Sequence, residues 1–349
     1  MSGTRDGRAA RWRRRLVTIP LYFVLGAAVW LGLPLLLPLA ALGDLVRGGR
    51  PWILVRCIAF FAWYLACEAV GIVSAGVLWV LERTLWRSRP ERTREALYRL
   101  QARWAAGLFA GGSRLFGFRL EVEGLEQVGD GPLLVFMRHA SVADTLLPAM
   151  VLGAQAGLRL RYVLKSELLW DPCLDLVGNR LPNAFVRRSS GDPEREVAGV
   201  LALVSGLGPR DGILIYPEGT RFTPAKRAQV LARIAAAGDP EALARAESLQ
   251  RVLPPRLGGP LGLLEHPRRV DVLFLAHHGF DRAASFWEFW NGGLVGRTIR
   301  VALWRAPHRD VPDDRAKRVE WLHEQWRRVD AWVQEQDARE PRAGAPHRR

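Results

Sequence analysis

The sequence has few cysteines and few lysines. It contains three cysteines in 349 residues, too few for a disulfide framework, which excludes a small secreted scaffold held together by disulfides. Three of its 50 basic residues are lysines, and arginine supplies the rest. The remaining composition, with 49% hydrophobic and 24% charged residues, is ordinary for a globular protein and excludes collagen, a long coiled coil and wholesale disorder.

Several common catalytic signatures are also missing. Without G-x-S-x-G, a hydrolase-type serine elbow is disfavoured. The phosphate-binding loop G-x-x-x-x-G-K-[ST] and the dinucleotide motif G-x-G-x-x-G do not occur, so nucleotide-binding folds lose support. Neither C-x-x-C nor H-E-x-x-H is present, so there is no zinc signature. His277 and His278 are adjacent near an expected strand end and would point to opposite faces, which disfavours joint metal ligation.

Charge and long apolar runs are what the sequence does have. Its net charge of +15 predicts an anionic partner: nucleic acid, a membrane surface or a phosphorylated substrate. Residues 16–42 form an uncharged run that contains three prolines, and residues 57–81 form a second run with one charge, Glu68. A bilayer core needs about 20 helical residues. The two runs, joined by a short connector, therefore predict an N-terminal transmembrane helical hairpin over residues 16–82.

Other interpretations of the hairpin remain open. A cleaved signal peptide is disfavoured because the first run is nearly twice the usual length of such a segment and a second run follows. A hairpin that dips into one leaflet also fits, since the prolines weaken the first helix. Arginines cluster before the first run, over a basic tail at residues 1–15, and after the second run. This distribution predicts that the tail and the downstream domain face the cytoplasm at the cell (inner) membrane.

Residues 90–336 read as one α/β domain, followed by a polar, disordered tail at 337–349. Apolar periodicity predicts strands that alternate with helices, which indicates a mostly parallel sheet flanked by helices. The expected strands are 118–122, 133–137, 160–164, 213–216, 270–276 and 298–303. The expected helices are 91–109, 144–152, 194–207, 224–236 and 319–333.

Three polar clusters follow apolar segments of this domain. His139 comes directly after an expected buried strand, and Asp144 opens the next helix, which puts the pair at the edge of a sheet where α/β proteins build sites. Two other His–Asp pairs have the same spacing, but His266 precedes a strand and His308 lies in a loop rich in arginine and proline. The second cluster is Tyr-Pro-Glu-Gly-Thr-Arg at 216–221, and the third is Phe-Val-Arg-Arg at 185–188.

In this order, and behind a membrane hairpin, the clusters resemble the sequence blocks of the glycerophospholipid acyltransferases, among them the 1-acylglycerol-3-phosphate acyltransferases. His139, Ser141 and Asp144 match the first block, Arg188 the arginine of the second, and residues 217–221 the third and most specific. Residues 252–255 loosely resemble the fourth. The resemblance covers roughly residues 119–259. Arg138 and Tyr216 depart from the usual residues, and a long insert at 223–250 precedes the fourth block.

The resemblance implies a glycerol-phosphate acyltransferase-like fold with no metal, no cofactor and no covalent intermediate. It assigns catalysis to His139 and Asp144, and acceptor binding to the following five residues: Arg188, Glu218, Gly219, Thr220 and Arg221. The chemistry supports this independently, because a histidine held by a carboxylate is a suitable general base near neutral pH. Backbone N–H groups after His139 are candidates for binding the oxyanion.

The sequence therefore predicts a membrane-bound acyltransferase. Its donor would be acyl-CoA or acyl carrier protein, and its acceptor a lysophospholipid, with 1-acylglycerol 3-phosphate first. Membrane lipids are the expected surroundings, and no nucleic-acid partner is expected. The alternatives are a different lysolipid acceptor or a catalytically silent lipid-binding protein of the same fold. An arginine-rich nucleic-acid binder would explain the charge but neither the hairpin nor the His–Asp pair.

Overall fold

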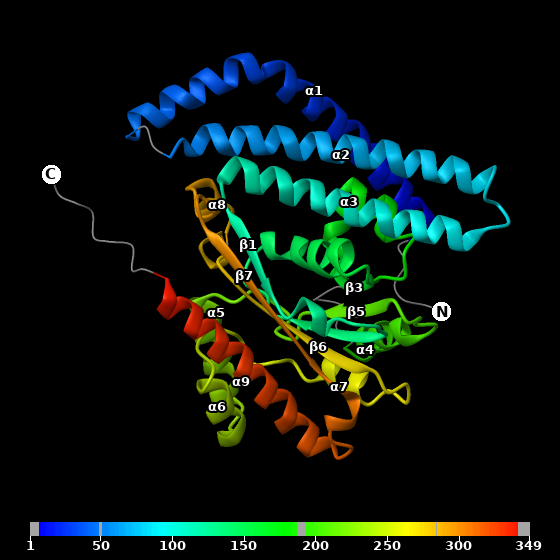
Figure 1. Cartoon of the computed structure of the whole chain (residues 1–349), viewed down its shortest axis with the longest axis vertical. Helices are drawn as coiled ribbons and strands as arrows, with labels where there is room; N and C mark the ends of the chain where they lie inside the picture. Colours follow the sequence, from blue (N-terminus) through cyan, green and yellow to red (C-terminus); the bar gives the residue numbers. More distant parts are fainter. Residues whose placement is uncertain (1–6, 49–50, 187–192, 284, 341–349) are drawn as a thin grey trace.

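The computed structural model describes residues 7–48, 51–186, 193–283 and 285–340 (Figure 1). The α-helices are α1 (Arg8–Val46), α2 (Ile53–Arg83), α3 (Pro90–Phe116), α4 (Pro193–Leu201), α5 (Pro224–Ala236), α6 (Pro240–Glu247), α7 (Gly258–Leu264), α8 (Phe286–Trp290) and α9 (Arg315–Arg339). The strands are β1 (Arg119–Glu123), β2 (Leu133–Met137), β3 (Arg159–Lys165), β4 (Ala184–Val186), β5 (Asp211–Ile215), β6 (Asp271–His278) and β7 (Thr298–Ala306).

The seven strands form one sheet in the order β1-β7-β6-β2-β5-β3-β4. Strands β2 to β6 are parallel to one another, and β7 joins β6 antiparallel, so β1 and β7 run against the other five. The prediction of a mostly parallel sheet flanked by helices is confirmed. In such a sheet the carboxyl ends of neighbouring strands lie at one edge, and this edge carries the first and third sequence blocks.

Alternation along the strands divides the core into two layers. In β2, Leu133, Val135 and Met137 face the layer that contains residues of α3, while Leu134 and Phe136 face the layer of α4, α7 and α9. All five residues of β2 are buried, as expected for a central strand covered on both faces. Figure 1 shows α9 across one face of the sheet and α3 across the other, with the hairpin outside α3.

Helices α1 and α2 form the predicted hairpin, and both are long and apolar enough to cross a membrane. Helix α1 continues through Pro20, Pro34 and Pro38, and Figure 1 shows it bowed. It begins at Arg8, so residues 8–15 of the predicted basic tail are helical. Arg14 and Arg15 instead bind the buried carboxylate of Asp175 in the downstream domain, each at 2.7 Å.

Other boundaries also differ from the sequence-based prediction. The helix expected at 144–152 is a 3₁₀ turn (Ala143–Leu146) followed by a π-helix (Pro148–Gln155). The insert folds into α5 and α6, which are capped by Thr223 and Asp239. Each of these side chains accepts a hydrogen bond from a backbone N–H of the first turn that follows it. Helix α9 reaches Arg339, so a disordered tail that starts at 337 is wrong for residues 337–339.

Candidate active site

The first and third blocks lie side by side because β2 and β5 are adjacent and parallel. Phe136 pairs with Ile215 in the sheet register, and the two chains leave the sheet together. Two hydrogen bonds then join the blocks. The His139 N–H donates to Oε1 of Glu218 at 2.8 Å, and the Phe222 N–H donates to the His139 carbonyl at 2.7 Å. The backbone of His139 is thus held on both sides by the third block.

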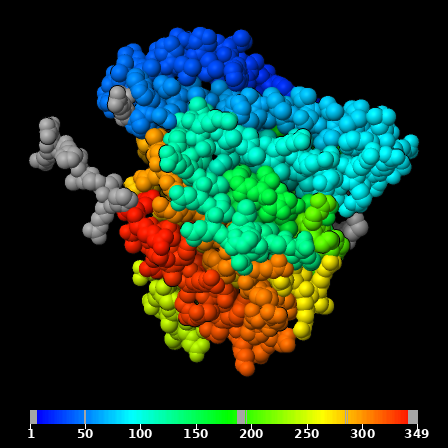
Figure 2. Space-filling model, in the orientation of Figure 1, coloured from blue at the N-terminus to red at the C-terminus, as the bar shows by residue number. Residues whose placement is uncertain are grey.

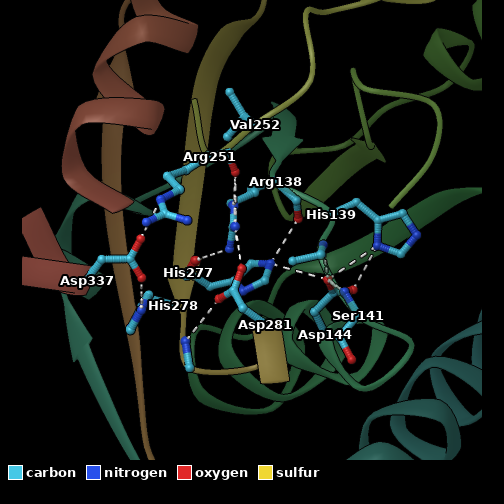
Figure 3. Close-up of polar contacts among 12 residues, drawn as sticks. Arg138, His139, Ser141, Asp144, Arg251, Val252, His277, His278, Asp281 and Asp337 are labelled. Carbon is cyan, nitrogen blue, oxygen red and sulfur yellow. Dashed lines mark hydrogen bonds and ion pairs between the residues drawn. The ribbon is translucent and has the colours of Figure 1, made fainter. Parts of the chain in front are cut away.

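The His139–Asp144 pair is formed as the strand–turn–helix arrangement predicted. Nδ1 of His139 lies 2.9 Å from Oδ1 of Asp144 (Figure 3). The N–H groups of Ala140 and Ser141 donate to Oδ2 of Asp144 at 2.6 and 2.7 Å, which closes the turn. Burial alone would raise the pKa of Asp144, but His139 and then His277 hold it well below its usual range. Asp144 is therefore a fixed anion next to the imidazole.

Part of the His139 imidazole is exposed to solvent. The His139 side chain is 15% exposed, whereas Asp144 is fully buried. No described residue forms a hydrogen bond with Nε2 of His139. The ring of Tyr216 lies against the imidazole, with centroids 4.4 Å apart and an interplanar angle of 35°. The ring is thus held by Asp144 and Tyr216 while Nε2 points away from the carboxylate.

Two residue assignments made from the sequence differ from the structure. Glu218 is buried, and its other oxygen, Oε2, accepts the Leu253 N–H at 2.8 Å. Both carboxylate oxygens are therefore bound to backbone N–H groups, one of which is that of His139. The candidate oxyanion donors after His139 are also occupied, because the Ala140 and Ser141 N–H groups bind Asp144.

The remaining predicted residues of the third block are half-buried in the loop before α5. Gly219 has φ +65°, and a β-carbon there would lie 2.7 Å from Cδ of Arg256, so only glycine fits without a shift. Oγ1 of Thr220 accepts a hydrogen bond from Nζ of Lys226 at 3.1 Å. Arg221 is half-buried in the same loop. Arg188 of the second block lies outside the described residues.

Sequence reasoning did not identify Arg138 and His277 as parts of this site. Arg138 is fully buried; its Nη1 donates to the His277 carbonyl at 2.9 Å and its Nη2 to Asp281. Nε2 of His277, at the end of β6, lies 3.3 Å from Oδ2 of Asp144. The signal available from the sequence was an arginine directly after a buried strand and a histidine at the end of another. No group of three or more His, Cys, Asp or Glu arranged to hold a metal occurs among the described residues.

The fold and the paired blocks can be compared with those of known proteins. Residues 119–258 match the model of the Acyltransferase family, and the predicted resemblance is confirmed.

The chain is similar to 1-acyl-sn-glycerol-3-phosphate acyltransferase epsilon of Mus musculus, with 24% identity over 208 residues. The match covers 56% of this chain and 55% of the mouse protein, so the chain spans about half the length of that relative. Among solved structures, it is similar to the crystal structure of the 1-acyl-sn-glycerophosphate acyltransferase PlsC from Thermotoga maritima. That comparison has a TM-score of 0.49 and 13% identity, and covers 79% of this chain and 98% of the other.

Proposed function

We propose that the chain transfers a fatty acyl group from an acyl thioester to the free hydroxyl of a lysophospholipid, and that 1-acylglycerol 3-phosphate is the acceptor. The observation that carries the proposal is the 2.9 Å contact of His139 Nδ1 with Asp144, which leaves Nε2 open beside the loop that contains Arg221. The family and the mouse relative support the same activity. The ordered pair argues against a catalytically silent protein.

In the proposed reaction, Nε2 of His139 takes the proton of the acceptor hydroxyl as its oxygen attacks the thioester carbonyl. Asp144 holds Nδ1–H and stabilises the imidazolium that forms. The tetrahedral intermediate then collapses, the C–S bond breaks, and the imidazolium returns the proton to the departing thiolate. Ser141 is buried and its hydroxyl donates to the Ala283 carbonyl, which supports direct transfer without an acyl-serine at this position.

The acceptor's phosphate is assigned to the third block. Arg221 supplies a planar guanidinium that can bind two phosphate oxygens, and Gly219 lets the loop backbone approach closely. Lys226, held at Thr220, adds a second cation to the same loop. Arg188 is proposed for the same phosphate from its sequence block alone. The donor is proposed to be acyl-CoA or acyl carrier protein.

The hairpin is proposed to hold the enzyme at the membrane. The outer surface of α1 carries many exposed apolar side chains, among them Leu16, Trp30, Leu31 and Leu35, and Figure 2 shows the hairpin along one side of the molecule. Only 11% of the residues in the most apolar stretch of α1 are buried. Such a surface buries its apolar area in lipid.

Contacts at both ends of α1 favour insertion into one leaflet over a crossing. Arg14 and Arg15 bind Asp175 at the first end, and Nη2 of Arg47 donates to Oδ1 of Asn291 at the other, 3.1 Å away. Both partners belong to the catalytic domain, so the start of α1 and the connector lie on the same side of the membrane as that domain. With the arginine distribution, this supports the cytoplasmic face of the inner membrane.

Lipid products test the activity. Purified protein is given labelled acyl-CoA, or acyl carrier protein, with a panel of lysolipids that includes a neutral monoacylglycerol. We expect labelled phosphatidic acid from the wild type and none from His139→Ala. Equal use of the neutral acceptor would reject the phosphate assignment, and no product from any acceptor would reject the activity.

Labelling tests the membrane arrangement. Val46→Cys places a thiol at the connector end of α1, where Val46 is 82% exposed. An impermeant reagent should label it in permeabilised cells and not in intact cells, whereas a membrane-crossing hairpin would give labelling in intact cells.

A further inference from the structure

His277 lies behind the catalytic pair, on the side away from solvent. It is fully buried near the end of β6, the strand that pairs with β2 on the opposite side from β5. Its Nε2 lies 3.3 Å from Oδ2 of Asp144 and 3.1 Å from the Arg138 carbonyl (Figure 3). Both neighbours of this nitrogen are oxygen atoms.

The two neighbours fix which nitrogen carries the proton. A carbonyl oxygen and a carboxylate oxygen can only accept hydrogen bonds, so Nε2 of His277 must carry a proton. It donates to the Arg138 carbonyl, and Oδ2 of Asp144 lies within ion-pair distance of the same nitrogen. Nδ1 is buried without a partner among the described residues, and the ring lies beside Phe280 at a centroid distance of 6.1 Å. A proton on Nδ1 would be a buried donor without a partner, so Nε2 is the nitrogen that carries the proton.

The contact of His277 with Asp144 differs in origin from the backbone hydrogen bonds to the same carboxylate. The Ala140 and Ser141 N–H groups belong to the same short turn as Asp144 and move with it. His277 belongs to strand β6, and Nη1 of Arg138 donates a hydrogen bond to its backbone carbonyl. The contact from His277 therefore fixes the Asp144 carboxylate relative to the sheet.

We propose that His277 is a positioning residue that holds the Asp144 carboxylate in the orientation His139 requires. It is fully buried and does not touch a substrate, so it acts through Asp144. The inference rests on the proposed acyl transfer for its kinetic consequence, but the hydrogen bond between His139 and Asp144 can be observed separately. Without the His277 donor, the carboxylate can turn about its side-chain bonds, and fewer molecules hold His139 ready to accept a proton.

The next residue provides a matched control. His278 is also a buried histidine on β6, and its Nε2 also binds a carboxylate, Oδ1 of Asp337 at 2.9 Å. It points to the opposite face of the sheet, toward α9, and has no contact with Asp144. Replacing either histidine removes a buried imidazole contact with a carboxylate, but only the contact of His277 reaches the catalytic pair.

Kinetics with four variants test the role: His277→Leu, His277→Gln, His278→Leu and His278→Gln. We expect His277→Leu to lower kcat by about 10- to 100-fold, the scale of one lost polar contact with a charged group, with both KM values unchanged. His277→Gln should stay close to wild type, because its amide N–H can replace Nε2–H. Both His278 variants should keep kcat, whatever they lose in melting temperature. Wild-type kcat in His277→Leu, equal kcat losses in the two Leu variants, or no rescue by Gln would each overturn the role.

A second readout does not depend on activity. The proton between His139 Nδ1 and Asp144 should give a downfield NMR resonance in the wild type that Asp144→Asn removes. We expect it to be lost or shifted in His277→Leu and kept in His277→Gln and His278→Leu. An unchanged resonance in His277→Leu would refute the positioning role. An inactive wild type that shows this pattern would instead refute the proposed acyl transfer.

Discussion

Removing the Glu218 carboxylate should destabilise the protein and slow catalysis without weakening acceptor binding. The carboxylate accepts the His139 and Leu253 N–H groups at 2.8 Å each, and it is buried. Glu218→Ala leaves two buried donors unpaired. Each unpaired buried donor costs about 1–3 kcal/mol, so the free energy of unfolding should fall by roughly 2–6 kcal/mol.

A loss of this size is large against a total stability of about 5–15 kcal/mol. For a domain of this length it corresponds to a melting temperature lower by roughly 5–20 °C. Glu218→Gln keeps one acceptor oxygen and loses the other, so its melting temperature should lie between those of the wild type and Glu218→Ala. Because the His139 backbone loses a support in both variants, kcat should fall while the KM of the acceptor stays the same.

Thermal unfolding in detergent, followed by circular dichroism, measures the first effect, and steady-state kinetics measure the second. Glu247→Ala is the control, since that glutamate is exposed on α6. A melting temperature of Glu218→Ala equal to that of the control would refute the support role. A higher acceptor KM with unchanged kcat would restore the sequence-based assignment of Glu218 to acceptor binding.

Three further predictions address other parts of the structure. Arg221→Lys should raise the acceptor KM by about 10- to 150-fold and leave the donor KM the same, because lysine cannot bind two phosphate oxygens at once as a guanidinium does. Steady-state kinetics with each substrate varied in turn measure both KM values, and an unchanged acceptor KM would contradict the prediction. Gly71→Ala should lower the melting temperature, because its β-carbon would lie 2.5 Å from Sγ of Cys173, whereas Gly76→Ala, with nothing within 4 Å, should not; equal melting temperatures would count against the packing of α2 on the domain. Burial alone would raise the pKa of Asp281, but Arg138 lowers it to about 2, so the ionised carboxylate stabilises the fold above pH 4 and this contribution is lost as the pH falls from about 4 to 2. In acid titrations of unfolding, Asp281→Asn should lose this part of the pH dependence of the unfolding free energy. An unchanged slope of that free energy against pH would argue against the ion pair.

The sequence was most informative where a residue's role depends on its immediate neighbours. Long apolar runs predicted α1 and α2, and β2 was predicted with its observed ends, Leu133 and Met137. The His139–Asp144 contact could be predicted because the strand, the turn and both side chains lie within a few residues. Strand β4 was missed because three residues are too few to show an alternating pattern.

Roles that depend on long-range pairing could not be predicted. From the sequence, Glu218 was assigned to acceptor binding. Its burial depends on the segment at Leu253 closing over it, and the sequence does not show this long-range approach. Helix α9 holds that segment: Nε1 of Trp326 donates to the Leu253 carbonyl at 2.9 Å. His277 contacts Asp144 only because β6 lies beside β2, a neighbour relationship that the strand pattern alone leaves open.

The central claim is that His139, held by Asp144, is the general base of the transfer. The most direct measurement is kcat for acyl transfer by His139→Ala compared with His266→Ala and His308→Ala, the two other histidines that lie five residues before an aspartate. We predict that His139→Ala loses at least about 100-fold in kcat, the scale expected of a general base, while the other two stay near wild type. Comparable activity in all three variants would contradict the account.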